Sequence, residues 1–269
     1  MTSTVFLAGS GGGFPDVSQL RTDPEDQTSF ETIDYPGWKR YVSPQFKPEL
    51  LISDLSAEIE SRVPSGPIRI VGISMGGHFG YLIALDLQAR GRQIEGLCAI
   101  DSFMVATAAP TPGWRNRALT EFVETIGRRR FGDLHILCRS KLWRAVLRAT
   151  GNMLPALLRR ASGLGWAVRV LEIDPILKRE LDIRMMAREC IPWLAKIDEA
   201  PSPLSIRAAL LRTRGNAASD AMWRSRCPAL VIYEIQGSHE TLFEAENVGC
   251  LREAFAKASR HWSYSTSNA

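Results

Sequence analysis

The sequence predicts an α/β protein with a mostly parallel central sheet flanked by helices. Short apolar or β-branched runs alternate with longer amphipathic segments, which is the pattern of βαβ units. One such run, Ile68–Val71, passes through a glycine-containing turn directly into a helical pattern. The last run, Ala229–Ile235, is followed by a loop and the amphipathic segment Val248–Ala258, so the same architecture returns near the end of the chain.

The first hundred residues supply the alternating elements in order. Thr4–Ala8 and Phe30–Asp34 are short, apolar or alternating runs that predict strands. Pro48–Val63 carries apolar residues at helical spacing with acids on the other face. The helix after the turn ends at Gly91, a natural C-cap, and Ile94–Ile100 follows as a buried strand.

Residues 104–203 interrupt this alternation with consecutive helical patterns. These patterns lie at Trp114–Ile126, Leu134–Leu147, Met153–Leu164 and Ile176–Ile191, the last closed by Pro192. The sheet resumes at Ile206–Leu211. We therefore expect a core of residues 1–103 and 204–269, with residues 104–203 as a helical lid insertion over the carboxyl edge of the sheet, where α/β folds bind ligands.

The turn after Ile68–Val71 contains a candidate nucleophile. It reads Gly72-Ile73-Ser74-Met75-Gly76, the G-x-S-x-G pattern of a serine exposed on a sharp strand-to-helix turn. Ser74 is the predicted nucleophile, and the alternative is a structural turn serine. The N–H of Met75, at the helix N-terminus, would face the negative charge that develops on a substrate oxygen.

A serine nucleophile needs a base and an acid that orients the base. The four histidines are His78, His135, His239 and His261. We predict His239 as the base, because it follows the last strand at the edge where Ser74 would lie. Asp101, at the end of Ile94–Ile100, and Asp220, after Ile206–Leu211, compete as the acid. Either gives the Ser…Asp…His order of an α/β-hydrolase fold.

A glycine run, Gly9–Gly13, follows the first predicted strand. The run lacks the Lys of a phosphate-binding P-loop. Its backbone N–H groups would suit the second half of an oxyanion hole. A plain flexible turn is the alternative.

Composition limits the class of protein. The chain has 269 residues, 45% hydrophobic and 23% charged, which is ordinary for a globular protein with one large domain or a domain with an insertion. Its five cysteines are odd in number and show no C-x-x-C spacing, which argues against a disulfide framework or a zinc site. We therefore expect no metal. No signal peptide or membrane span is recognisable, so we expect a cytoplasmic protein with no membrane partner.

The formal net charge of +4 conceals a basic segment. Residues 114–160 hold eleven Lys or Arg and three acids, a balance of +8. The segment shows no nucleic-acid-binding module, so we do not expect nucleic acid as a partner. A solvated helix face and a docking surface for an acidic partner both remain open.

Two stretches resemble one enzyme family. ISMGGHFGYLIALDLQARGRQIEGLCAIDSF and QGSHETLFEAENV are similar to the thioesterase domains of nonribosomal peptide and polyketide synthetases. The resemblance covers most of residues 1–103 and 204–258. It implies that the acid is Asp101, 27 residues after Ser74, and that the Met75 and Gly11 N–H groups form the oxyanion hole.

The resemblance implies a serine thioesterase with the triad Ser74, Asp101 and His239. It would release an acyl or peptidyl chain from a phosphopantetheinyl carrier protein by hydrolysis or cyclisation, with no cofactor of its own. A carboxylesterase or lipase with the same triad is one alternative. An inactive hydrolase-fold binding protein is another.

Overall fold

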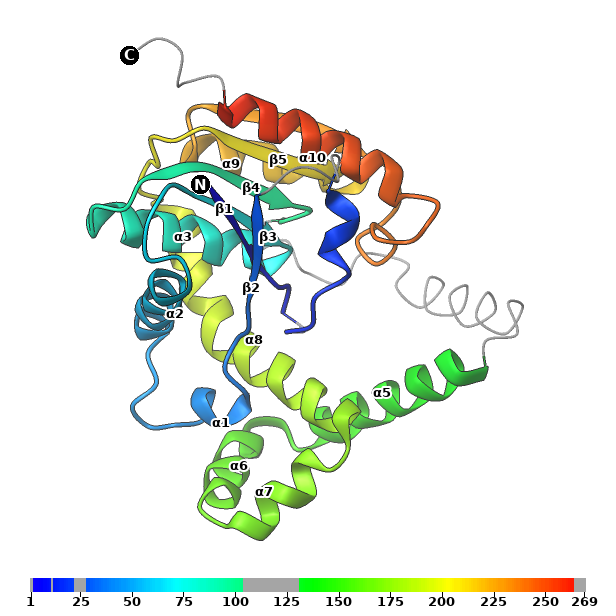
Figure 1. Cartoon of the computed structure of the whole chain (residues 1–269). Helices are drawn as coiled ribbons and strands as arrows, with labels where there is room; N and C mark the ends of the chain where they lie inside the picture. The colour runs from blue at the N-terminus through cyan, green and yellow to red at the C-terminus, as the bar shows by residue number, and fades with distance from the viewer. Residues whose placement is uncertain (1, 11, 22–27, 104–130, 264–269) are drawn as a thin grey trace. The chain divides into compact units, whose positions relative to one another are not determined.

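The computed structural model of the protein describes residues 2–10, 12–21, 28–103 and 131–263 (Figure 1). The chain divides into two compact units. The first comprises Met1–Tyr35, Lys47–Val105 and Pro192–Ala269, and the second comprises Pro36–Phe46 and Ala106–Ile191. Helix α8, Pro175–Glu199, begins in the second unit and ends in the first.

The first unit contains a parallel sheet, as the sequence predicts. In the described residues six strands pair in the order β2-β1-β3-β4-β5-β6, and every neighbouring pair is parallel. The strands are β1 Ser3–Leu7, β2 Ser29–Ile33, β3 Ile68–Ile73, β4 Ile94–Ile100, β5 Ala208–Thr213 and β6 Leu230–Ile235. The predicted strands are confirmed, and their ends differ by no more than one or two residues.

Helices cover both faces of this sheet because its strands are apolar on both sides. Ile70 and Val71 are both fully buried, although neighbouring residues of a strand point to opposite faces. The Ile70 face packs against α3, Met75–Ala89, on which α2, Pro48–Arg62, is stacked. The Val71 face packs against α10, Val248–Ser263, in the apolar cluster that contains Phe255.

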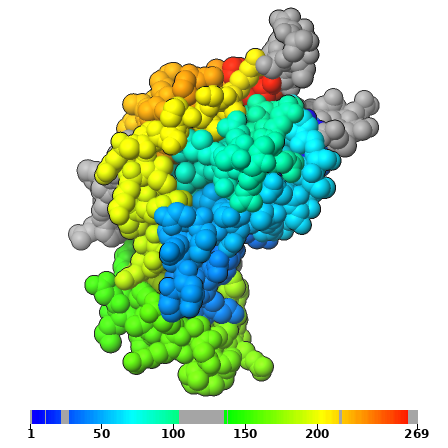
Figure 2. All heavy atoms as spheres, turned by 90° about the vertical axis from the view of Figure 1, so that its left-hand side faces the viewer, coloured from blue at the N-terminus to red at the C-terminus, as the bar shows by residue number. Residues whose placement is uncertain are grey.

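The α2 side of the first unit is held together by arginines near the end of α3. Figure 2 shows α2 and the segment from α3 into β4 side by side on one face. Arg90 Nη1 donates to Glu60 Oε2 at 3.0 Å, and Arg92 Nη2 donates to the carbonyl of Val63 at 2.8 Å. These bonds fix the end of α2 where the chain turns into β3.

The described part of the second unit is helical. Its helices are α1 Trp38–Tyr41, α5 Phe131–Ala149, α6 Leu154–Ser162, α7 Gly165–Glu172 and most of α8. The helices predicted at Leu134–Leu147 and Met153–Leu164 correspond to α5 and α6. The helix predicted at Trp114–Ile126 lies outside the described residues, and α7 was not predicted.

Hydrogen bonds tie Pro36–Phe46 to the helices of the second unit. The backbone N–H of Trp38 donates to Asp182 Oδ1 of α8 at 2.6 Å, and Arg159 Nε of α6 donates to the carbonyl of Val42 at 2.9 Å. The sequence pattern alone did not connect this segment with residues more than one hundred positions away.

The prediction that Pro192 ends the last lid helix is wrong, because α8 continues to Glu199. A proline inside a helix costs one hydrogen bond and about 3 kcal/mol. Residues after Pro192 offset that cost: Leu194 is fully buried, and Asp198 forms an ion pair with Arg226. Although α8 is 25 residues long, neither it nor any other described helix is apolar enough to cross a bilayer.

Candidate active site

Ser74 lies on a strained turn between β3 and α3. Its backbone angles are φ 55° and ψ −120°, a region that non-glycine residues rarely adopt. The turn is fixed at both peptide groups: Ser74 N–H donates to the carbonyl of Ile100 at 2.8 Å, and the Ser74 carbonyl accepts from Ser102 Oγ at 2.6 Å. The strain therefore persists because β4 and the residues after it hold the turn.

The glycines around Ser74 are required by close backbone contacts. A Cβ on Gly72 would lie 2.1 Å from the carbonyl oxygen of Gly76, and a Cβ on Gly76 would lie 2.4 Å from the carbonyl oxygen of Leu7. A Cβ on Gly77 would lie 2.1 Å from Ser102 Oγ. The motif thus lets α3 start directly against β1 and the end of β4.

His239 and Asp101 form a hydrogen-bonded pair. His239 Nδ1 donates to Asp101 Oδ2 at 2.8 Å, and the Asp101 side chain is fully buried. Asp101 Oδ1 accepts from the N–H and the hydroxyl of Thr213, each at 2.9 Å. Because Nδ1 keeps its proton and donates it in a hydrogen bond to the carboxylate, Nε2 of the neutral imidazole is left as the basic nitrogen.

The loop that carries His239 is built after β6. Gly237 has φ 92°, and a Cβ there would lie 2.8 Å from the Asn247 side chain. Asn247 Nδ2 donates to the Thr241 carbonyl at 3.0 Å, and the N–H of Ser238 donates to Thr241 Oγ1 at 2.9 Å. These bonds close the loop so that His239 points back to Asp101 at the carboxyl edge of the sheet.

Asp220, the competing acid, lies elsewhere. It is the first residue of α9, Asp220–Arg226, and forms an ion pair with Arg212. Arg212 Nε lies 2.7 Å from Asp220 Oδ1. Of the two carboxylates left open by residue position, the one hydrogen-bonded to His239 is Asp101.

The predicted oxyanion donors are only partly described. Met75 is the first residue of α3, and the first N–H groups of a helix have no acceptor within it. Gly11 lies outside the described residues. Gly9, two residues earlier, lies beside the predicted nucleophile, since a Cβ on Gly9 would be 3.4 Å from the Cβ of Ser74. The glycine run therefore starts next to Ser74.

The comparisons with known proteins place the chain in a family. Residues 4–257 match the model of the thioesterase domain family. The chain belongs to the thioesterase family. No curated protein sequence matches it significantly.

Solved thioesterase structures share the fold of this thioesterase. A covalent complex of the NocB thioesterase domain with a fluorophosphonate nocardicin G analog has a TM-score of 0.60 and 17% identity, covering 96% of this chain and 95% of that one. A Vlm2 thioesterase domain bound with a dodecadepsipeptide has a TM-score of 0.58 and 19% identity, over 96% and 93%. RedJ thioesterase from the prodiginine pathway of Streptomyces coelicolor has a TM-score of 0.58 and 16% identity, over 95% and 89%. The α/β-hydrolase fold predicted from the sequence is thereby confirmed.

Two residues of the candidate site were missed by sequence reasoning. Thr213 holds Asp101, and Ser102 holds the Ser74 carbonyl. Thr213 ends β5, which neighbours β4 in the sheet. The rule that carboxyl ends of parallel strands meet at one edge was a usable signal for Thr213, whereas the sequence offered none for Ser102.

The other histidines lie in other surroundings. His78 is buried, and both of its ring nitrogens have hydrogen-bond partners within the first unit. His135 belongs to α5 of the second unit, and His261 to α10. The described residues contain no group of three or more His, Cys, Asp or Glu placed to hold a metal ion.

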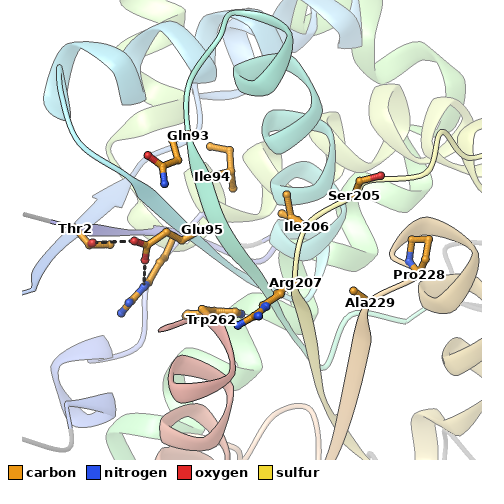
Figure 3. Close-up of a pocket in the computed structure, with 11 residues that line it drawn as sticks. Thr2, Gln93, Ile94, Glu95, Ser205, Ile206, Arg207, Pro228, Ala229 and Trp262 are labelled. Carbon is orange, nitrogen blue, oxygen red and sulfur yellow. Dashed lines mark hydrogen bonds and ion pairs between the residues drawn. The ribbon is translucent and has the colours of Figure 1, made fainter. Parts of the chain in front are cut away.

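A cavity of about 820 Å³ lies at the opposite, amino edge of the sheet. Figure 3 shows Thr2 pointing toward Glu95, with Trp262 and Arg207 nearby. Thr2 Oγ1 is 3.2 Å from Glu95 Oε1, and Arg69 Nε is 2.8 Å from Glu95 Oε2. The cavity is therefore separate from the edge that carries Ser74, Asp101 and His239.

Proposed function

We propose that this thioesterase releases an acyl or peptidyl chain from a phosphopantetheinyl carrier protein through an acyl-enzyme on Ser74. The observation that carries the proposal is the 2.8 Å hydrogen bond between His239 and Asp101, at the sheet edge that also carries the strained Ser74 turn. The relatives support it: the NocB complex holds a fluorophosphonate covalently, and the Vlm2 structure holds a dodecadepsipeptide.

Acylation follows from the chemistry of the three side chains. His239 Nε2 takes the proton of the Ser74 hydroxyl as the oxygen attacks the thioester carbonyl. The tetrahedral oxyanion is stabilised by backbone N–H groups, for which we propose Met75 and Gly11. The C–S bond then breaks, His239 returns the proton to the thiolate, and the pantetheine thiol leaves. Buried Asp101 stabilises the imidazolium that forms between these steps.

Deacylation repeats the same steps with a new nucleophile. His239 removes a proton from water, or from a hydroxyl or amine of the bound chain, which attacks the Ser74 ester. The bond between the acyl group and Ser74 Oγ then breaks, and His239 returns the proton to Oγ. Water gives a free acid, and an internal nucleophile gives a cyclic product. No step transfers an electron or requires a metal ion, so these residues suffice for the reaction.

The basic residues of the second unit support the proposal that the partner is acidic. A cavity of about 480 Å³ there is lined by Arg144, Arg148, Arg184 and Arg188, together with Glu180. Glu180 is only 6% exposed and forms an ion pair with Arg144. Arg144 Nε lies 2.8 Å from Glu180 Oε2. The remaining arginine charge suits an acidic carrier protein or the pantetheine phosphate.

Turnover of pantetheine thioesters and matched oxygen esters by the wild type and by Ser74→Ala tests the proposal. We expect thioester cleavage by the wild type and its loss in Ser74→Ala. Oxygen esters cleaved much faster than matched thioesters would favour a carboxylesterase. No cleavage of free or carrier-bound substrates by folded wild type, with no labelling of Ser74 by a fluorophosphonate, would indicate an inactive binding protein.

A further inference from the structure

A fully buried arginine lies behind the catalytic edge. Arg226, the last residue of α9, has no exposed surface, and arginine is almost never buried without partners. One Nη donates to Asp198, near the end of α8. Its guanidinium also lies 4.7 Å from the ring centroid of Tyr81 and 5.1 Å from that of Trp223. This charge is enclosed by an acid and two aromatic rings.

The second Nη of Arg226 determines the tautomer of His78. Arg226 Nη1 lies 3.0 Å from His78 Nδ1. A guanidinium has no acceptor, so Arg226 is the donor and Nδ1 carries no proton. The proton is therefore on Nε2, which donates to the carbonyl of Phe103 at 2.9 Å. Burial, together with the Arg226 charge, lowers the pKa of His78 to about 3, so this imidazole is neutral at physiological pH.

The carbonyl that His78 holds belongs to the segment that carries the catalytic acid. Asp101, Ser102 and Phe103 are consecutive, and Asp101 has a φ of 46°, which a non-glycine residue keeps only when its surroundings fix it. Trp223 Nε1 donates to the Ser102 carbonyl at 2.7 Å. Successive carbonyls of this segment are thus held by two buried donors.

The same segment contacts the catalytic base. The ring of Phe103 lies edge-on to His239, with ring centroids 5.2 Å apart, and Asp101 accepts a hydrogen bond from His239 Nδ1. The hydroxyl of Ser102 holds the carbonyl of Ser74. A shift of the segment would therefore displace the acid, the base and the nucleophile together.

We propose that His78, oriented by Arg226, and Trp223 are positioning residues of the thioesterase: they hold the Phe103 and Ser102 carbonyls and so fix Asp101 and Phe103 against His239. The inference rests on the triad of the proposed function. These side chains touch neither the substrate nor the reacting atoms. Loss of these side chains should therefore lower kcat and the reactivity of Ser74, because a misplacement of catalytic groups by about 1 Å costs about a hundredfold in rate.

Four variants test this assignment. His78→Phe keeps an aromatic ring, although a six-membered one, and removes both nitrogens, whereas His78→Gln retains an acceptor and a donor. Trp223→Phe removes the bond to Ser102. Trp262→Phe is the matched control, since it makes the same change in a buried tryptophan at the amino edge of the sheet. For each variant, kcat and KM on a pantetheine thioester, the rate constant of Ser74 phosphonylation by a fluorophosphonate, and the Tm are measured.

We expect His78→Phe and Trp223→Phe to lower kcat and the phosphonylation rate constant in parallel, by about 10- to 100-fold, with KM changed less than threefold. His78→Gln should recover most of the loss, and Trp262→Phe should stay within twofold of wild type. A purely structural role would instead lower the Tm and the fraction of labelled sites while the rate constant stayed at the wild-type value.

The result also separates this inference from the proposed function. If wild type is active and Ser74→Ala inactive, but His78→Phe and Trp223→Phe retain wild-type kcat, the positioning role is refuted and the triad stands. If His78→Phe does not fold, Trp223→Phe and His78→Gln decide: a wild-type rate in Trp223→Phe refutes the role. If Ser74 does not react with the fluorophosphonate in wild type, the proposed function itself fails.

Discussion

Replacing Asp101 by asparagine exchanges one carboxylate oxygen for an NH₂ group. The hydrogen bonds around Asp101 determine which way the new amide will face. The Asp101 carboxylate accepts from Thr213 N–H and Oγ1 with one oxygen and from His239 with the other. The asparagine amide has one oxygen and one NH₂ group to distribute between these partners. If NH₂ faced Thr213, a buried backbone N–H would lose its acceptor, at a cost of about 1–3 kcal/mol.

The amide oxygen should therefore stay on Thr213, and the NH₂ group should face His239. It would then donate to Nδ1, so the imidazole proton would move to Nε2, the nitrogen that accepts the Ser74 proton in the proposed mechanism. The buried negative charge that stabilises the imidazolium would also be lost. In serine enzymes this substitution lowers kcat about 10⁴-fold, which corresponds to about 5.5 kcal/mol of transition-state stabilisation.

The assay is kcat and KM on a pantetheine thioester, with Tm as the measure of folding. Asp101→Asn should lose at least a thousandfold in kcat, with a KM within a few fold of wild type. Asp220→Asn is the matched control: it removes a carboxylate charge that pairs with Arg212, so kcat should change less than threefold. A folded Asp101→Asn enzyme with a loss below tenfold, or a larger loss in Asp220→Asn, would refute Asp101 as the orienting acid.

Three further changes test the backbone around the candidate site and the proposed docking surface. Gly76→Ala places a Cβ 2.4 Å from the carbonyl oxygen of Leu7, so it should cost about 3 kcal/mol of folding free energy, a Tm decrease of about 6–12 °C by calorimetry. An unchanged Tm would contradict the close contact. Thr213→Val removes one hydrogen bond to the buried acid and keeps the backbone one, so kcat should fall about tenfold in the same thioester assay; a wild-type kcat would count against this bond. Arg148→Glu should raise KM about 5- to 10-fold for a carrier-bound substrate relative to a free pantetheine thioester, and Arg252→Glu on α10 is the control. Equal ratios in both variants would argue against carrier docking at this cavity.

The sheet and the elbow could be predicted from the sequence because their signals are local. A strand, a G-x-S-x-G turn and a helix follow one another within a short segment, and Gly72 and Gly76 report a steric requirement that no other residue meets. The final strand and the loop with His239 are equally local. In a parallel sheet these elements must bring their carboxyl ends to one edge, so the candidate residues follow from their order.

The choice between the two candidate acids shows what local sequence signals cannot predict. By position Asp101 and Asp220 each follow a strand of the sheet, and only their partners distinguish them: Thr213 and His239 for one, Arg212 for the other. The same limit explains the error at Pro192. Proline predicts a helix end from local chemistry, whereas the buried side chain of Leu194 and the ion pair of Asp198 with Arg226 favour continuation of the helix.

The geometry of the proposed site therefore depends on residues that carry no motif. Asp101 follows directly from the strand before it, but its positive φ and its orientation are fixed by Thr213, 112 residues away, while Trp223 anchors the next carbonyl from 121 residues away. These partners come from β5 and α9, which approach the end of β4 only in the folded sheet. It follows that substitutions in this later part of the chain, in side chains that touch no substrate, should alter the rate of acyl transfer more than the binding of the substrate.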